Sequence, residues 1–386
     1  MRQLIVATVT VVALALVIPG EAGAAQALHL NVDAFIPGTQ VSPGSSGIFG
    51  VALSPDESKV YAAYWTATAG PSQPIEAYST STYSLVNSMS YGTCHGDVVI
   101  SPDGRYAFTP SYYQGDISRF DLQNGNARTS IGLGSWADEV WMTPDGKKIL
   151  VGYNDPSRYP WDKTSVAVVD VDVGAFTNLG SVGLNRPGPT GNHIAFSADS
   201  RYAYLDSWRS TTEGPALLEV DLQSRSITRS LPLPGFHLSG VQRLGDELFV
   251  GSYDQKKIFA VDMDTFSLLP TQEISLSYSP WDIALYPDGT HLFTLGFYDG
   301  NLEVVDLVGR SVESTLNMAS PFNIQFTADG SRAYIAQMYD CGGPGLGGIT
   351  VLRVTSSSAP VPAPGAFVLV GIGVASVRWL RKRRTL

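Results

Sequence analysis

The chain has 386 residues, of which 44% are hydrophobic and 10% aromatic, so it can build two ordinary domains or one large β-architecture. The two terminal segments hold six of the 25 basic residues and one of the 35 acidic ones, which leaves residues 25–364 with a net charge of −15. This charge repels phosphate backbones, so we expect no nucleic-acid partner. Cations are better candidates as binding partners.

Residues 1–24 have the pattern of a secretory signal peptide. Arg2 supplies a short positive start, residues 4–18 form an apolar core, and residues 22–24 are a small-residue cleavage signal. A retained membrane helix is the alternative, although the apolar run is short for a span. We therefore expect export, which would permit a disulfide between Cys94 and Cys341.

Seven copies of one unit occupy most of the remaining chain. Each copy has an apolar run, a turn of the Pro-Asp-Gly type and a second apolar run. The residue before the Pro-Asp pair recurs about every forty-five residues, at Ser54, Ser101, Thr143, Ser197, Leu244, Tyr286 and Thr327. A period of this length with several short strands per unit is typical of a β-propeller. In the sixth unit, four strands are expected at 279–286, 290–297, 301–307 and 311–318.

The seventh unit is one strand short, because after residues 348–354 the chain enters a Ser/Pro-rich stretch. Residues 28–36 are a strand candidate with no unit of their own. We therefore predict an all-β fold over residues 25–354: a seven-bladed β-propeller of four-stranded antiparallel blades, whose N-terminal strand closes the last blade. Closure would remove exposed sheet edges. We interpret an Asp at the end of most third strands as a turn former, at Asp121, Asp170, Asp221, Asp262 and Asp306.

The starts of the seven inner strands, aligned on the repeated turn, carry polar residues. A β-branched residue stands three positions before the turn anchor in every copy, and directly ahead of it come Gly50, Asp97, Glu139, His193, Gly240, Asp282 and Asn323. Neighbouring positions add His95, Asp138, Asn192, His237 and Ser239. We predict a ligand-binding set at the mouth of the central channel, made of His95, Asp97, Asp138, Glu139, Asn192, His193, Asp282 and Asn323. A solvated channel rim without a ligand is the alternative.

A divalent cation is a candidate cofactor for this rim, although the sequence does not fix one. Carboxylates that converge repel one another unless a cation or water relieves them. Ca²⁺ is favoured over Zn²⁺ because it prefers oxygen ligands, whereas a contribution from His193 would favour a transition metal. The oxygen ligands would be Asp97, Glu139, Asp282 and Asn323.

The loops after the second strands should surround the same rim, because antiparallel order returns the chain to that face. The longest are residues 65–74, 154–165, 207–216 and 339–348. Aromatic residues crowd the ends of the second strands, at Tyr64, Trp65, Tyr112, Tyr113, Tyr153, Trp208, Tyr253, Phe297, Tyr298 and Tyr339. These aromatic residues either pack in the core or form a ring that binds a ligand, and the sequence leaves both roles open.

The C-terminal end has three parts. Residues 355–364 are a Ser/Pro linker, residues 365–377 are uncharged and apolar, and a basic cluster follows. A span of 16 residues reaches only ~24 Å, short of the ~30 Å hydrocarbon core. Residues 355–386 resemble the PEP-CTERM sorting signal, with Ala363 where that family has Glu. The resemblance implies that an exosortase-type peptidase removes the tail; a permanent membrane anchor is the alternative.

The repeats resemble YVTN-type propellers and, more distantly, lactonase-like seven-bladed proteins. The resemblance rests on the motif [ST]-[PA]-D-[GS]-x-x-h-[YF] and covers residues 27–354. We therefore expect an exported, monomeric binding or scaffold module at the cell surface, with a polysaccharide or protein ligand. The alternatives are a metal-dependent hydrolase of lactonase type and a structural envelope protein. G-x-S-x-G, H-E-x-x-H, phosphate-loop and CxxCH motifs are absent from the sequence.

Overall fold

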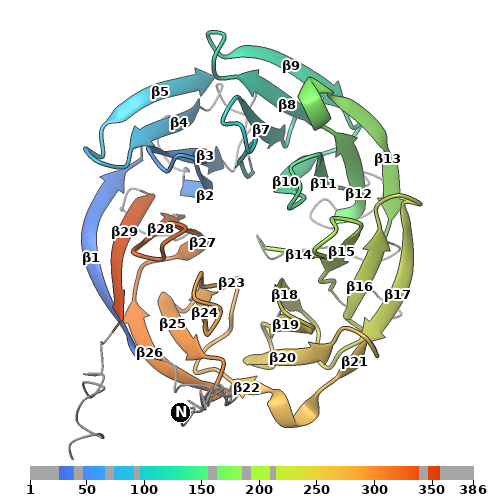
Figure 1. The fold of residues 1–386 in the computed structure, drawn as a ribbon, viewed down its shortest axis with the longest axis vertical. Coiled ribbons are helices and arrows are strands. Elements are labelled where there is room, and N and C mark those ends of the chain that lie inside the picture. The colour runs from blue at the N-terminus through green and yellow to red at the C-terminus, as the bar shows by residue number, and fades with distance from the viewer. Residues whose placement is uncertain are drawn as a thin grey trace, which may run out of the picture.

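Seven antiparallel sheets stand like blades around a central axis (Figure 1). The structure is a computed structural model that describes residues 26–38, 47–65, 74–90, 96–154, 163–184, 193–208, 214–338 and 347–356. The predicted seven-bladed β-propeller is confirmed. Within these ranges, no helix is long and apolar enough to cross a membrane. The predicted signal peptide, most of the linker and the basic tail lie outside the described residues.

Blades 1 to 6 follow the chain from the innermost to the outermost strand, whereas the outermost strand of blade 7 is the N-terminal one. Blade 1 is β2 (Gly47–Leu53), β3 (Lys59–Trp65), β4 (Pro74–Ser79) and β5 (Leu85–Ser90). Blade 2 is β6 (Val99–Ile100), β7 (Tyr106–Ser111), β8 (Asp116–Asp121) and β9 (Ala127–Gly132). Blade 3 is β10 (Ala137–Met142), β11 (Lys148–Asn154), β12 (Lys163–Asp170) and β13 (Thr177–Gly183), with a 3₁₀ turn at Asp172–Gly174. Blade 4 is β14 (Ala195–Phe196), β15 (Tyr202–Leu205), β16 (Ala216–Asp221) and β17 (Ser226–Pro232).

Blade 5 has a divided outer edge. It contains β18 (Leu238–Leu244), β19 (Glu247–Ser252) and β20 (Lys257–Asp262), and both β21 (Ser267–Leu268) and β22 (Ile274–Ser275) pair with β20 around a 3₁₀ turn at Pro270–Gln272. Blade 6 is β23 (Asp282–Leu285), β24 (His291–Gly296), β25 (Asn301–Asp306) and β26 (Ser311–Asn317), as the sequence predicted. Blade 7 is β27 (Pro321–Phe326), β28 (Arg332–Gln337), β29 (Gly348–Ser356) and β1 (Leu28–Pro37).

The N-terminal strand closes the ring. β1 pairs antiparallel with β29 from Leu28 opposite Ser356 to Pro37 opposite Gly348, and the two lie side by side at the edge of the ring (Figure 1). Leu28 and Ile36 are buried in the clusters on either side of blade 7. The predicted closing strand is therefore confirmed.

The repeated Ser/Thr-x-Asp turn is held by the same hydrogen bonds in five blades. In blade 3, Thr143 Oγ1 donates to Asp145 Oδ1 at 2.7 Å and accepts the backbone N–H of Lys148 at 3.0 Å. The equivalent bonds start from Ser54, Ser101, Ser197 and Thr327. Blade 5, the weakest copy in the sequence, instead joins Leu244 to Glu247 by a two-residue turn in which Gly245 has φ 59°.

The Asp residues at the ends of third strands are turn formers, as predicted. Asp221 Oδ1 accepts the backbone N–H groups of Gln223 and Ser224 at 2.8 and 3.0 Å. The carboxylates of Asp121, Asp170, Asp262 and Asp306 accept a backbone N–H two or three residues further along the chain in the same way.

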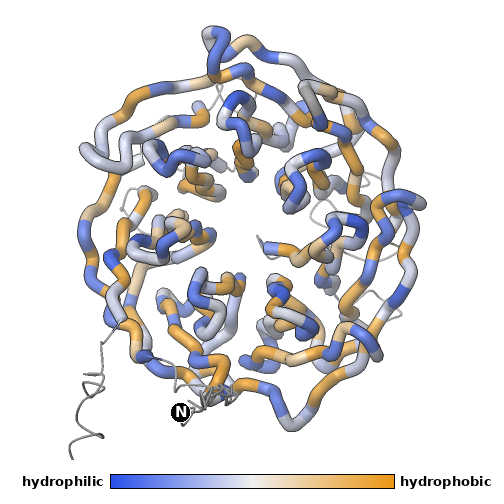
Figure 2. The backbone as a smooth tube through the Cα atoms, viewed as in Figure 1, coloured by the Kyte–Doolittle hydropathy of each residue, from blue (hydrophilic) through white to orange (hydrophobic). Residues whose placement is uncertain are grey.

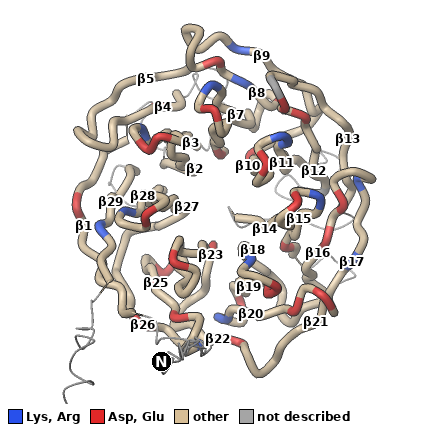
Figure 3. Tube along the Cα trace, viewed as in Figure 1, with Lys and Arg blue, Asp and Glu red and all other residues tan. Residues whose placement is uncertain are grey.

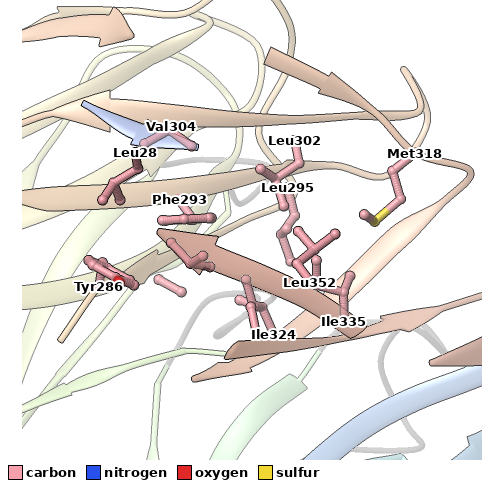
Figure 4. Close-up of a cluster of buried hydrophobic side chains, with 13 residues drawn as sticks. Leu28, Tyr286, Phe293, Leu295, Leu302, Val304, Met318, Ile324, Ile335 and Leu352 are labelled. Carbon is pink, nitrogen blue, oxygen red and sulfur yellow. The ribbon is translucent and has the colours of Figure 1, made fainter. Parts of the chain in front are cut away.

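The hydrophobic core is divided among the blade junctions. Seven clusters of buried side chains each join two neighbouring blades, and Figure 4 shows the one between blades 6 and 7. Apolar and polar segments are interspersed along the tube (Figure 2). Inner strands such as β3 and β24 are buried along almost their whole length, whereas burial alternates along the outer strand β17. An eighth cluster, of Phe49, Phe297 and Phe322, joins three blades.

Candidate functional site

The inner strands carry a β-bulge close to their starts in four blades. The pairing shifts between Ile48 and Gly50 in β2 and between Pro321 and Asn323 in β27. Equivalent shifts occur in β10 and β18. A bulge inserts an extra residue and re-aims the side chains around it, so the aligned polar residues do not follow a simple in-and-out alternation. The bulged residues include Phe49, Asp138, Ser239 and Phe322.

His193 connects blades that are not neighbours. The chain that leads into β14 reaches toward the middle of the ring (Figure 1). His193 Nδ1 lies 2.6 Å from Oδ2 of Asp282 in blade 6, and its backbone carbonyl accepts the N–H of Val241 in blade 5 at 2.9 Å. Asp282 is fully buried, whereas 19% of the His193 side chain is exposed. The two residues form a charged contact across the channel mouth.

The surroundings of His193 favour its protonated form. Burial lowers the pKa of His193, but the charge and hydrogen bond of Asp282, the charge of Asp97 and the backbone of Ile324 together raise it above the ordinary value. Blades 2, 6 and 7 therefore all act on one imidazole of blade 4. The imidazolium balances carboxylates that would otherwise repel one another in a buried setting.

Two other predicted rim residues, Asp97 and Asn323, are buried and accept backbone N–H groups. Asp97 Oδ1 accepts the N–H of Val98 at 2.7 Å, and Asn323 Oδ1 accepts the N–H of Val51 in blade 1 at 3.4 Å. Asp97, Glu139, Asp282 and Asn323 are each at most 4% exposed. These four side chains are therefore shielded from bulk solvent.

Small residues in one blade make room for the polar residues of the next. A Cβ on Gly50 would lie 2.0 Å from Asp97 Oδ1, and one on Gly240 would lie 2.8 Å from Asp282 Oδ1. A Cβ on Gly96 would meet the backbone carbonyl of Asp138 at 1.4 Å. The two glycines in the aligned set thus each precede a carboxylate-bearing blade, a relationship that was visible in the sequence but was not recognised.

A metal site remains a prediction. Among the residues that the structure describes, no group of three or more His, Cys, Asp or Glu side chains is placed to hold an ion. His95 and Asn192, the remaining members of the predicted binding set, lie outside those residues, as do Cys94 and Cys341. Acidic positions do lie beside the channel in several blades (Figure 3).

An aromatic belt runs over the face on which the inner strands begin. We define it as Trp208, His237, Tyr253, Trp281, Phe297, Tyr298, Phe322 and Phe49, from blade 4 through blade 7 to blade 1. Adjacent ring centroids along the belt lie 3.9–6.4 Å apart. Tyr112, Tyr113 and Trp136 form a separate group over blades 2 and 3.

The sequence predicted only part of the belt. Aromatic residues after the second strands were noted, and Trp208, Tyr253, Phe297 and Tyr298 belong to the belt. The contributions from the inner-strand starts were missed, although Phe49, Trp281 and Phe322 each directly precede one of the seven aligned positions. Burial lowers the pKa of His237 in the belt to about 4, with Asp254 acting against this, so His237 is a neutral ring near neutral pH.

Comparison with known proteins supports the fold. No protein-family model matches the chain, and no curated protein sequence matches it. Among solved structures, the chain is similar to the Kuenenia stuttgartiensis hydrazine synthase, with a TM-score of 0.65 and 15% sequence identity. The match covers 83% of this chain and 99% of the other. At this identity the likeness shows that the chain has a β-propeller fold, and it shows nothing finer.

Proposed function

We propose that this chain is a binding module of the cell surface, which receives its ligand on the face that carries the aromatic belt. The observation that supports the proposal is the belt itself: it crosses five blades on one face and lies at the same strand ends as the His193–Asp282 pair. Rigid aromatic side chains beside a few fixed polar groups are characteristic of binding surfaces. On the opposite face, the polar side chains of the repeated turns bond mainly to their own turns.

The terminal segments supply the location in this proposal. The signal-peptide pattern of residues 1–24 supports export, and the PEP-CTERM-like pattern of residues 355–386 supports surface sorting with an exosortase-type peptidase as a processing partner. The ligand is then extracellular, a polysaccharide or a protein. Mass spectrometry of the mature protein from its native host tests the processing step: a retained Arg381–Leu386 end would contradict it.

Tryptophan fluorescence tests the binding function. The mature protein is titrated separately with the polysaccharide fraction and the protein fraction of the host envelope. We expect a saturable change with one of them that is lost in Trp281→Ala, because this ring contacts both neighbouring parts of the belt. The matched control is Tyr113→Ala, which lies on the same face but outside the belt. Absence of a saturable change with either fraction would contradict the proposal.

A hydrolase of lactonase type is distinguished by its metal. Elemental analysis of the purified protein, followed by a panel of lactones and esters, gives the comparison. The binding proposal expects no metal-dependent turnover. A stoichiometric divalent ion together with lactone hydrolysis, both lost in the double variant Asp97→Asn and Asp282→Asn, would replace it by a catalytic function at the channel mouth.

A further inference from the structure

We propose that the ligand presents a quaternary or methylated ammonium group, which is held by Tyr253, Trp281 and Tyr298. This inference rests on the proposed binding function and names the chemistry of its ligand. The three residues come from two blades: Tyr253 follows β19, Tyr298 closely follows β24, and Trp281 directly precedes β23. They form the part of the belt between blades 5 and 6.

The three rings are nearly perpendicular to one another. Their centroids are 6.4 Å apart for Tyr253 and Trp281, 6.3 Å for Tyr253 and Tyr298, and 5.7 Å for Trp281 and Tyr298. The interplanar angles are 89°, 81° and 83° in the same order. A cation seated over the triangle of centroids lies within about 6 Å of all three, which is the range of cation–π attraction. Three such walls suit a compact, roughly spherical group.

The rings are held in place but are open to a ligand. Tyr298 is 67% exposed, and Tyr253 and Trp281 are partly exposed. Trp281 packs against Phe322 at 5.7 Å between centroids, and Tyr253 stacks on His237 at 5.1 Å and 27°. The low pKa of His237, about 4 because of burial, means that this supporting ring is neutral. It therefore does not repel a cation.

Two carboxylates give the site its negative charge. Tyr253 and Tyr298 are each followed by an aspartate, in the matching sequences Tyr253-Asp254 and Tyr298-Asp299. Asp254 Oδ1 accepts the N–H groups of Phe236 and His237 at 3.0 Å each, and Asp299 Oδ2 accepts the N–H of Ser279 at 3.1 Å. Although burial raises the pKa of Asp254, hydrogen bonds from the Phe236 backbone, Gln255 and the His237 backbone lower it overall, so the group is anionic.

The ring faces distinguish methylated from primary ammonium groups. Asp254 Oδ1 accepts hydrogen bonds from two backbone N–H groups and Oδ2 accepts one from Gln255, so this carboxylate attracts a cation mainly through its charge. The N–H donors of a primary ammonium would give up hydrogen bonds to water on moving against the three ring faces, which is costly. A methylated ammonium has few or no such donors and keeps the charge. A sugar is less suited, because its flat apolar face stacks on one broad platform and these rings offer three perpendicular ones.

Choline and its neutral carbon isostere, with a tert-butyl group in place of trimethylammonium, test the inference on the mature protein. Binding is followed by tryptophan fluorescence and by broadening of the ligand methyl signals in NMR. We expect choline to bind about tenfold more tightly than the isostere. Tyr298→Ala should weaken choline binding about fivefold, whereas Tyr298→Phe, which keeps the ring, should stay within about twofold of wild type. Circular dichroism checks that Tyr298→Ala is folded, and Tyr113→Ala is the control.

Equal binding of choline and its isostere, or no binding of choline, would overturn the inference. Binding of a neutral oligosaccharide that Tyr298→Ala abolishes, with no response to choline, would assign the rings to a sugar instead. If choline fails but an envelope fraction still gives a saturable change that Trp281→Ala removes, the ammonium inference fails and the binding function stands. If all of these titrations are flat, both fail.

Discussion

The two faces of the propeller use polar side chains in different ways. On the face of the repeated turns, Ser54, Ser101, Thr143, Ser197 and Thr327 make one pattern of local hydrogen bonds five times over. On the opposite face, the equivalent positions of the seven blades carry five different residue types, from Asp97 to His193 to Asn323. Their bonds cross between blades. Repetition marks what every blade needs to fold, and variation marks where the blades combine into one site.

Removal of β1 should have the largest effect, because both faces depend on closure of the ring. Deletion of residues 26–37 leaves β29 with an unpaired edge and opens the clusters that contain Leu28 and Ile36. We expect an aggregated or unfolded product in size-exclusion chromatography and circular dichroism. A monomer with an unchanged melting temperature would show that closure by this strand is dispensable.

The Asp282→Asn variant tests the face on which the aligned residues vary from blade to blade. It removes the counter-charge of His193 in a buried setting, so we expect the free energy of unfolding to fall by about 3 kcal/mol in urea denaturation. The exposed Asp246→Asn is the matched control. Adding His193→Gln to Asp282→Asn should recover part of the loss, since the uncompensated charge is then absent. Equal losses of unfolding free energy for Asp282→Asn and Asp246→Asn would show that the His193–Asp282 contact stabilises the fold no more than a surface contact does.

Gly50→Ala tests the fit between blades at the same face. The added Cβ would lie 2.0 Å from Asp97 Oδ1 and 2.7 Å from its Cα, so blade 2 must shift. We expect a loss of about 2 kcal/mol in unfolding free energy. Gly132→Ala is the control, because a Cβ there meets nothing within 4 Å. If both variants unfold alike, the glycine is not needed for the carboxylate of the next blade.

Ser101→Ala tests the repeated face. The substitution removes the bond to Asp103 and the bond from the N–H of Tyr106, so we expect a loss of about 1 kcal/mol. The same change at the exposed Ser88 serves as the control. Because each turn is local, Ser101→Ala and Thr143→Val should be additive within about 0.5 kcal/mol. Strong coupling between these two sites would contradict the view that this face is a set of independent turns.

The pH dependence of stability gives the finest comparison. The pKa of His193 is raised in the folded protein, because Asp282, Asp97 and the Ile324 backbone outweigh burial. Its contribution to stability is therefore complete below the unfolded pKa of about 6.5 and is lost as the pH rises through the folded pKa. Urea denaturation near pH 6 and near pH 9 should show a larger decrease for wild type than for His193→Gln. Identical decreases would mean that the imidazole is not charged in the folded state.

The sequence predicted the ring because its signals are local and repeated. Each Ser/Thr-x-Asp turn, and each Asp at the end of a third strand such as Asp221, makes hydrogen bonds within a few residues. The N-terminal strand at 28–36 had no unit of its own, and the seventh unit was one strand short, so pairing with the seventh unit could be predicted. The channel mouth was harder. The partner of His193 lies 89 residues away, and the bulge at Ser239 depends on pairing that no local pattern reveals. Alignment of the inner strands found the right residues, but their burial and partners required the packed structure.

The join between β1 and β29 also sets an order of events. Leu28 pairs with Ser356, and Arg353 reaches Asp33 over a separation of 320 residues. A chain that is synthesised N-terminus first exposes β1 at the start, yet the partner of that strand, β29, is the last strand of the propeller to be made. Blades 1 to 6 can form their sheets before synthesis is finished, but the ring cannot close until β29, up to Ser356, has been made. Closure of this long loop is the slow, non-local step of assembly, and it leaves both ends of the domain at one point on its outer edge.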